Sequence, residues 1–150
     1  MPYLTSTPTV SSGVAYSSGD SVGGKVTLAG GGLLQGQMGL LNSLLLTDVS
    51  NQKAVLEILL FDSDPTAGTY TDNAALALST DLTKIVARIP VAAADYVTID
   101  SKAVAHLSNL QRFVMPASGQ TSLFMAVLTT GTPTYTSVAA LQFRFGIDPR

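Results

Sequence analysis

Hydrophobic positions recur along the chain mostly with a period of two, which is the spacing of a β-strand with one buried face. The clearest segment is 136–148, where the apolar side chains fall on one face and Gln142 and Arg144 fall on the other. The apolar positions of that face are Ala139, Leu141, Phe143, Phe145 and Ile147. Residues 53–61 and 121–130 are apolar on both faces, which predicts strands inside a sheet.

Further segments carry strand patterns, and one carries a helical composition. The other predicted strands are 13–16, 25–30, 33–49 (a bent strand or strand pair), 85–91, 95–99 and 103–115. Pro90 cannot donate a backbone hydrogen bond, so the 85–91 strand is expected at a sheet edge. Asp72 and Asn73 can cap the Ala/Leu-rich run that follows them, which predicts one short helix over 72–79.

This pattern gives about eight short strands separated by turns, with no repeating helical crossover. We therefore predict an all-β fold, an antiparallel β-sandwich, with a jelly roll as the first choice of topology. Residues 1–12 contain two prolines among Thr and Ser and no helical spacing, so we expect an extended N-terminal arm. Residues 13–150 suffice for one hydrophobic core and are expected to form a single β-sandwich domain.

Composition adds an expectation about partners. Charged residues make up 12% of the chain, against about 25% in soluble domains, while 46% of residues are hydrophobic. Part of the apolar surface is therefore expected to lie against other subunits. The eight Lys and Arg residues stand singly, so there is no basic stripe for a nucleic acid. The sequence has no cysteine, no signal-peptide pattern and no membrane-spanning apolar run, and we expect a soluble product made in the cytoplasm.

Three aspartates, Asp62, Asp64 and Asp72, follow the 53–61 strand and raise the question of a cation site. A calcium-binding loop that starts at Asp62 needs Gly at its sixth position and Glu at its twelfth. The chain has Ala67 and Asn73 there, so this template fails. A looser cation site built from the three aspartates is kept as a candidate, although turn formation and helix capping explain the same residues.

The remaining chemical groups form no catalytic pattern. His106 is the only histidine, and nothing near it in sequence indicates nucleophilic catalysis. Glu57 is the only glutamate and is expected at a rim position or in an ion pair with a basic residue. Other aspartates, among them Asp48 and Asp81, fall near element ends and are interpreted as turn or cap residues. We therefore predict that the chain is not an enzyme and has neither a cofactor nor a resident metal.

The sequence resembles small virion structural proteins of tailed bacteriophages, of the capsid decoration or cement type. The resemblance lies in three stretches, TPTVSSGVAYSSGDSVGGKVTL, LEILLFDSDPTAGTYTDNAAL and LFMAVLTTGTPTYTSVAALQFRFGID. It implies a β-sandwich that assembles as a homo-oligomer, often a trimer, on the outer surface of a capsid. There it would bridge subunits of the major capsid protein and reinforce the shell. Proteins of this type have no catalytic residues.

The N-terminal arm is the segment expected to contact the partner, because an extended chain can pair with a neighbouring strand. The expected partner-binding residues are Pro2, Tyr3, Leu4, Pro8 and Val10. Two alternatives stay open. One is another virion component, such as a head-tail connector, tail or fibre module, and the other is a carbohydrate-binding β-sandwich.

Overall fold

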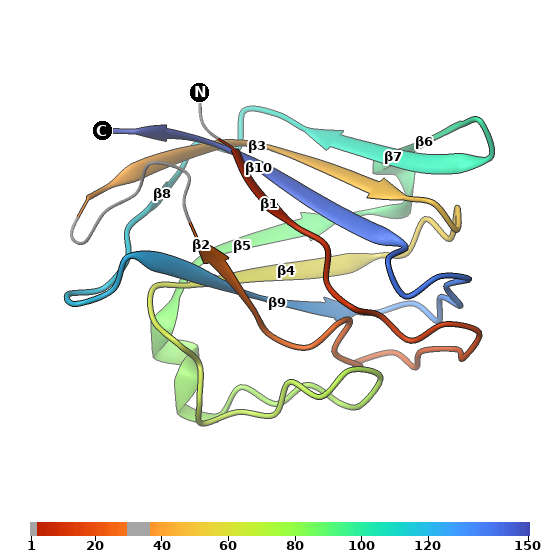
Figure 1. Ribbon diagram of the computed structural model, residues 1–150, viewed down its shortest axis with the longest axis horizontal. Coiled ribbons are helices and arrows are strands. Elements are labelled where there is room, and N and C mark those ends of the chain that lie inside the picture. Colours follow the sequence, from red (N-terminus) through yellow and green to blue (C-terminus); the bar gives the residue numbers. More distant parts are fainter. Residues whose placement is uncertain (1–2, 30–36) are drawn as a thin grey trace.

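The computed structural model describes residues 3–29 and 37–150, and its strands form two antiparallel sheets packed face to face (Figure 1). The strands are β1 (Tyr3–Ser6), β2 (Val26–Ala29), β3 (Gly39–Asp48), β4 (Leu56–Phe61), β5 (Ile85–Val91), β6 (Tyr96–Ile99), β7 (Lys102–Leu107), β8 (Arg112–Val114), β9 (Ser122–Thr129) and β10 (Leu141–Pro149). The predicted all-β antiparallel sandwich is confirmed.

The two sheets have defined strand orders. The six-stranded sheet runs β1-β10-β3-β7-β6, with β8 paired to the N-terminal part of β3. The four-stranded sheet runs β2-β9-β4-β5. Consecutive strands from β1 to β4 therefore lie in alternate sheets, so the chain crosses from one sheet to the other at each of these connections. The jelly-roll topology stays a prediction.

The strand assignments with the strongest periodicity are confirmed. β10 buries Phe143 and Phe145 in the core and exposes Arg144, as its alternation predicts. Ala139 is the exception, because β10 begins at Leu141 and Ala139 is exposed in the preceding turn. β4 lies between β9 and β5, and it buries Ile58 and Leu60 in the main core and Leu59 and Phe61 in a second cluster on its other face, which explains why both of its faces are apolar. β5, which contains Pro90, is an edge strand, as expected from the missing backbone donor.

The main hydrophobic core fills the space between the two sheets. Its largest fully buried side chains include Tyr16, Tyr135, Phe143, Phe145, Leu44, Leu46 and Ile58. Tyr16 and Tyr135 pack edge to face, with ring centroids 5.8 Å apart. Residues far apart in the sequence thus share one core, and the two sheets are held together by burial rather than by covalent cross-links.

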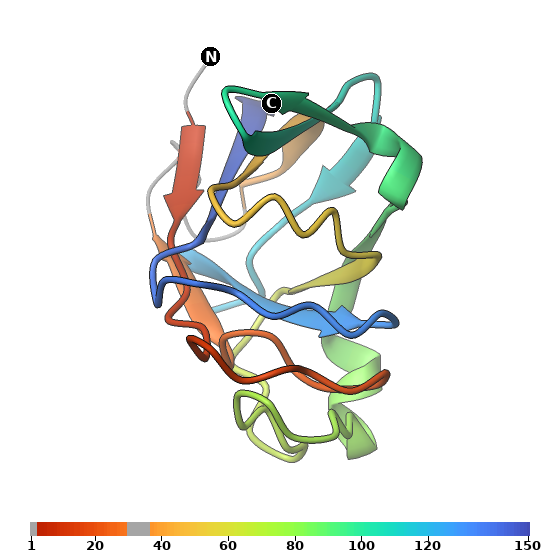
Figure 2. The same ribbon diagram turned by 90° about the vertical axis from the view of Figure 1, so that its right-hand side faces the viewer.

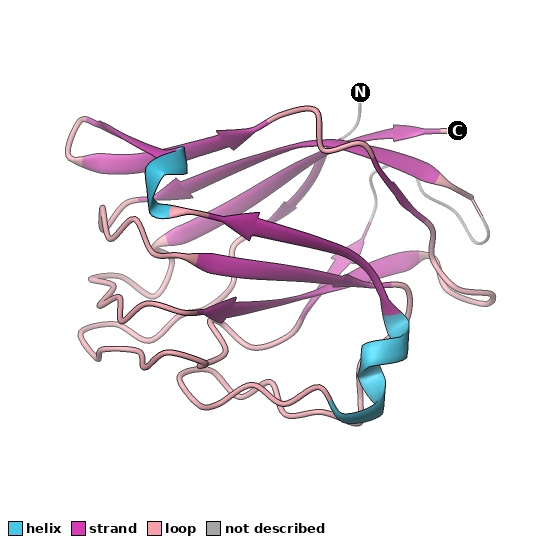
Figure 3. Cartoon of the chain, turned by 180° about the vertical axis from the view of Figure 1, so that it is seen from behind, coloured by secondary structure: helices cyan, strands magenta, loops and turns pink. Residues whose placement is uncertain are grey.

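The helix predicted over 72–79 is wrong. The helical residues instead form two short 3-10 helices, η1 (Ser79–Lys84) and η2 (Ala93–Asp95) (Figure 3). Residues 74–77 are held extended because their backbone bonds to other loops: Ser21 donates to Ala74, Leu76 donates to Gly19, and Thr69 pairs with Ala77. Tertiary hydrogen bonds here outweigh the helix propensity of Ala and Leu. The strand predicted over 13–16 is also a loop.

The described part of the predicted N-terminal arm belongs to the sandwich. β1 pairs with β10 in register from Tyr3 to Ser6, and Val10 donates a backbone hydrogen bond to Val138. In Figure 2, β1 lies along the margin of the sandwich beside β2, and the two strands are in contact. Residues 3–12 are therefore an edge strand and its continuation. Within the described residues, no helix has the length and hydropathy needed to cross a membrane.

Candidate interaction surface

The segment 62–84 covers the outer face of the four-stranded sheet, on the side away from the six-stranded sheet (Figures 1 and 2). Its side chains form a second, smaller core with that face. Tyr70 packs edge to face on Phe61, with ring centroids 6.1 Å apart, and Leu76 and Leu78 pack against the same cluster. The segment is therefore a structured layer of the molecule and not a loose loop.

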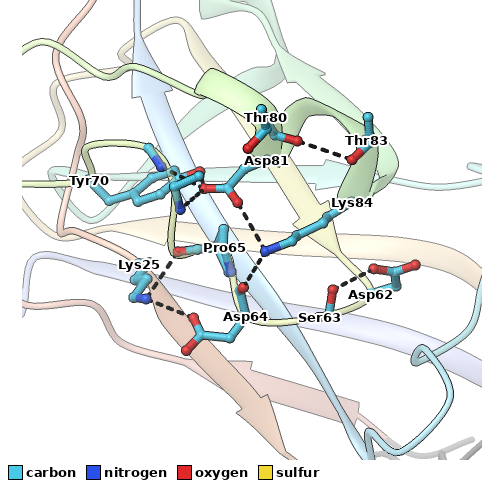
Figure 4. A network of polar contacts seen from close by, with 12 residues as sticks. Lys25, Asp62, Ser63, Asp64, Pro65, Tyr70, Thr80, Asp81, Thr83 and Lys84 are labelled. Atoms are coloured by element: carbon cyan, nitrogen blue, oxygen red, sulfur yellow. Dashed lines mark hydrogen bonds and ion pairs between the residues drawn. The ribbon is translucent and has the colours of Figure 1, made fainter.

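Asp81 is at the centre of the polar contacts of this segment (Figure 4), and its side chain is fully buried. Its Oδ2 accepts hydrogen bonds from the backbone N–H of Ala67 at 2.9 Å, the N–H of Gly68 at 2.8 Å and the hydroxyl of Tyr70 at 2.8 Å. Its Oδ1 forms an ion pair with Nζ of Lys84 at 3.1 Å. One carboxylate thus joins the start of the segment to its end.

The charge on Asp81 is stabilised despite its burial. Burial is the largest single effect and raises the pKa of the carboxyl group. The hydrogen bonds from Tyr70, Gly68 and Ala67 and the contact with Lys84 lower the pKa, and together they outweigh the effect of burial. The resulting pKa is about 2, so Asp81 is ionised at neutral pH. Burial, followed by the hydrogen bond to Asp81, raises the pKa of Tyr70 above its ordinary value.

Asp72 joins the same segment to the N-terminal part of the chain. Its Oδ1 accepts hydrogen bonds from the hydroxyl of Tyr16 at 2.6 Å and from the backbone N–H of Gly23 at 2.7 Å. Its Oδ2 accepts a hydrogen bond from the hydroxyl of Ser11 at 2.6 Å. Burial, and next the hydrogen bond to Asp72, raises the pKa of Tyr16 to about 12. Asp72 therefore stabilises a junction of three chain segments.

The three aspartates considered as a cation site have separate partners. Asp64 pairs with Lys25 at 2.7 Å, and Asp62 accepts a hydrogen bond from Ser63 at 3.0 Å. Asp72 is occupied by the three hydrogen bonds described above. Among the residues that the structure describes, no group of three or more His, Cys, Asp and Glu side chains is arranged to hold a metal ion. The structure thus does not bring Asp62, Asp64 and Asp72 together.

An open depression of about 400 Å³ lies beside the same segment. Its lining residues are Lys25, Pro65, Thr66, Gly68, Thr69, Tyr70 and Thr71. The two titratable side chains of this lining are already engaged, Lys25 with Asp64 and Tyr70 with Asp81. What remains available is hydroxyl and backbone surface, which can accept and donate hydrogen bonds but supplies no paired acid and base.

Other polar residues singled out in the sequence lie outside this segment. Glu57 pairs with Arg88 on the neighbouring strand at 2.7 Å, which confirms the expected ion pair. Asp48 is buried and accepts backbone hydrogen bonds from Ser50 and Gln52, so its interpretation as a turn residue is also confirmed. His106 is exposed on β7.

The residues predicted to bind a partner are mostly buried in their own domain. Leu4, Pro8 and Val10 are buried in the isolated chain. Tyr3 stays exposed, with the guanidinium of Arg144 5.4 Å from its ring centroid. Pro2 lies outside the described residues. Leu4 and Val10 belong to the main core and Pro8 is buried, so contact of these three residues with a partner stays a prediction, and it requires residues 3–12 to leave the sandwich.

The apolar side chains that do reach the surface were missed by the sequence analysis. Phe113, Met115 and Met38 are exposed and line an open groove of about 300 Å³. We call it the β8 groove, and its other lining residues are Asp62, Val86 and Val114. Val97 and Ile99 on β6 are a second exposed apolar pair. Periodicity could not identify them, because it does not show which face of a strand meets solvent.

Comparisons of the chain with protein-family models, with characterised proteins and with solved structures found no match. Any functional assignment therefore depends on the surface and interior described above and on the resemblance in the sequence.

Proposed function

We propose that this chain is a structural virion protein that decorates and reinforces the outer surface of a bacteriophage capsid. In this role it binds major capsid protein subunits as a homo-oligomer, for which the resemblance implies a trimer. It is made in the host cytoplasm and carries neither a cofactor nor a catalytic site. Nucleic acid and membranes are not its partners.

The observation that carries the proposal is the exposed apolar surface of the β8 groove. Met38, Phe113 and Met115 are exposed, although most of the large apolar side chains of the two sheets are buried in the core. Contiguous apolar surface on a soluble protein marks a site of association. Methionine and phenylalanine also suit contact with a repeating partner, because Met adapts its shape and Phe supplies a large buried area. The low content of charged residues supports the same role.

Binding to capsids that lack this protein tests the proposal directly. We expect the purified chain to co-sediment with such capsids and to saturate at a fixed ratio to the major capsid protein. Phe113→Ser should weaken binding at least tenfold, because it removes the largest side chain of the β8 groove. Leu82→Ser is the matched control, since Leu82 and Phe113 are both 62% exposed. The proposal is contradicted if the chain does not co-sediment with capsids, or if Phe113→Ser and Leu82→Ser weaken capsid binding equally.

A carbohydrate-binding β-sandwich is the second candidate, and the open depression beside Lys25 favours it. Its lining offers the hydroxyls of Thr66, Thr69 and Thr71, which suit hydrogen bonding to a sugar. Binding on a glycan array that is lost in Thr69→Val would support this candidate. Another virion role, in the connector, tail or fibre, is separated from capsid decoration by the position of the protein on the particle.

A further inference from the structure

The free edge of the six-stranded sheet, at β6, differs from the other sheet edges. β1 contacts β2, and β5 contacts β8, so these edge strands are partly covered by the opposite sheet. β5 also exposes Arg88 and Pro90, residue types that prevent edge-to-edge pairing. β6 lies at the margin of its sheet (Figures 1 and 2) and has no charged residue or proline. The β6 edge therefore lacks the charged residues and prolines that commonly protect an edge strand.

β6 also exposes apolar side chains on one face. Val97 is 61% exposed and Ile99 is 58% exposed, and both point away from the core because they alternate with buried Tyr96. Neighbouring Lys102 and Val104 on β7 stand opposite Ile99 and Val97 in the register. A short apolar strip thus runs along an open sheet edge.

The turn of the β6–β7 hairpin determines which backbone groups face outward. Asp100 and Ser101 have φ values of 51° and 59°, as a type I′ turn requires, and the register pairs Ile99 with Lys102. Residues that flank a two-residue turn form a hydrogen-bonded pair, and such pairs alternate along the ladder. Ile99 and Val97 therefore bond to β7, while the N–H and C=O of Thr98 point away from it.

We propose that β6 pairs with β6 of a second copy of this chain, antiparallel and with Thr98 on the two-fold axis. In this register the two Thr98 residues exchange two backbone hydrogen bonds. Val97 of each copy then stands opposite Ile99 of the other, so the four exposed apolar side chains cover one another on a single face. No like charges meet between Tyr96 and Ile99, because β6 carries none.

Self-pairing is favoured over an unrelated strand because the strand is complementary to itself in this register. The pairing is isologous and closes at two copies. It joins two monomers, or two larger oligomers if another surface forms those, and it does not depend on a virion role. The contact is short, so we expect it to be weaker than interfaces of the standard size, about 1,600 Å².

Cross-linking between engineered cysteines tests this register, and the chain has no native cysteine to interfere. Cα atoms of a hydrogen-bonded antiparallel pair lie about 5.5 Å apart, so a short bismaleimide can join two copies of Thr98→Cys. Thr27→Cys is the matched control, because Thr27 is exposed on β2, an edge strand of the other sheet. We expect a dimer band for T98C only. Cross-linking of T98C no greater than that of T27C overturns the proposal.

Sedimentation velocity provides a second readout. Val97→Lys should halve the mass of the largest species formed by the unmodified chain, because Lys desolvation and repulsion oppose pairing. Val138→Lys should leave that mass unchanged, since Val138 is 54% exposed and lies in a loop. An equal mass for V97K and the unmodified chain at every concentration overturns the proposal. Cross-linking of T98C to a capsid subunit in place of its own copy also overturns it.

Discussion

At the scale of single residues, the buried carboxylate of Asp81 holds the 62–84 segment on the sheet. It receives three hydrogen bonds and one ion pair, and its partners Ala67 and Gly68 lie more than ten residues away. The sequence predicts only that Asp81 lies near an element end. Its burial follows from contacts across the segment, which neither spacing nor composition encodes.

Asp81→Asn is expected to lower the free energy of unfolding by roughly 3 kcal/mol, because it removes a buried charge and with it the ion pair to Lys84. Chemical denaturation of the variant and the parent measures this difference. Asp100→Asn is the control, since Asp100 is exposed in a turn, and it should change stability by less than about 0.5 kcal/mol. Equal effects of the two substitutions contradict the anchoring role.

The contribution of Asp81 should also depend on pH. The unfolded chain titrates this group near pH 3.9, about the ordinary value, whereas the pKa in the folded chain is about 2. The unfolded state therefore binds the proton first, so the stabilisation is complete above about pH 4 and is lost as the pH falls towards 2. The stability difference between parent and D81N should shrink across this window. A constant difference there would argue against an ionised Asp81.

Gly68 is required by close packing and not by its backbone angles. A Cβ atom at this position would overlap the carbonyl oxygen of Ala77 and crowd the Tyr70 hydroxyl. Gly68→Ala should therefore destabilise the fold by roughly 1–3 kcal/mol in thermal or chemical denaturation. Gly131→Ala is the matched control, because a Cβ there meets nothing closer than 3.8 Å. Equal stability of the two variants would show that the segment adapts.

At the scale of elements, the sequence predicts strands well where both faces have a clear character. β10 alternates cleanly, β4 is apolar on both faces, and Pro90 places β5 at an edge. The prediction from the sequence fails over 72–79, because Ala and Leu favour a helix locally while long-range backbone hydrogen bonds hold the segment extended. Pairing with distant segments is a property of the folded chain, so local preference could not reveal it.

The N-terminal strand β1 is expected to stabilise the domain. Leu4→Ala should cost about 2–5 kcal/mol, because Leu4 is buried in the main core beside β10. Thr5→Ala, on the exposed side of the same strand, should cost less than about 1 kcal/mol. Denaturation midpoints of the two variants measure the contrast. If neither substitution changes stability, β1 is not paired with β10 in solution, and the N-terminal arm is free to contact a partner as the sequence predicts.

At the scale of the whole molecule, buried tyrosines should make the fold sensitive to alkali. Burial first, and then the neighbouring carboxylates, raises the pKa of Tyr16 to about 12 and the pKa values of Tyr70, Tyr96 and Tyr135 still further. Unfolded tyrosine ionises near pH 10, so stability is complete below about pH 10 and falls as the pH rises towards 12. Thermal unfolding measured across this pH range should show the loss of stability. Tyr16→Phe should reduce the slope of stability against pH. A slope unaffected by Y16F would contradict this cause.

In the described part of the chain, the two-sheet core is combined with exposed apolar side chains at the β8 groove and at the β6 edge. The fold class could be predicted from periodicity, whereas these two surfaces could not, because the sequence does not show which apolar residues the folded chain leaves uncovered. They are the physical basis for the proposal that the chain binds other subunits.

The central claim is tested most directly by cryo-electron microscopy of virus particles purified from cells that make this chain, together with its copy number per major capsid subunit. The account predicts density for the sandwich on the outer capsid surface, at a fixed ratio, with Phe113 and Met115 against a neighbouring subunit. Density confined to the connector or tail, or particles that contain no copies of the chain, would contradict it.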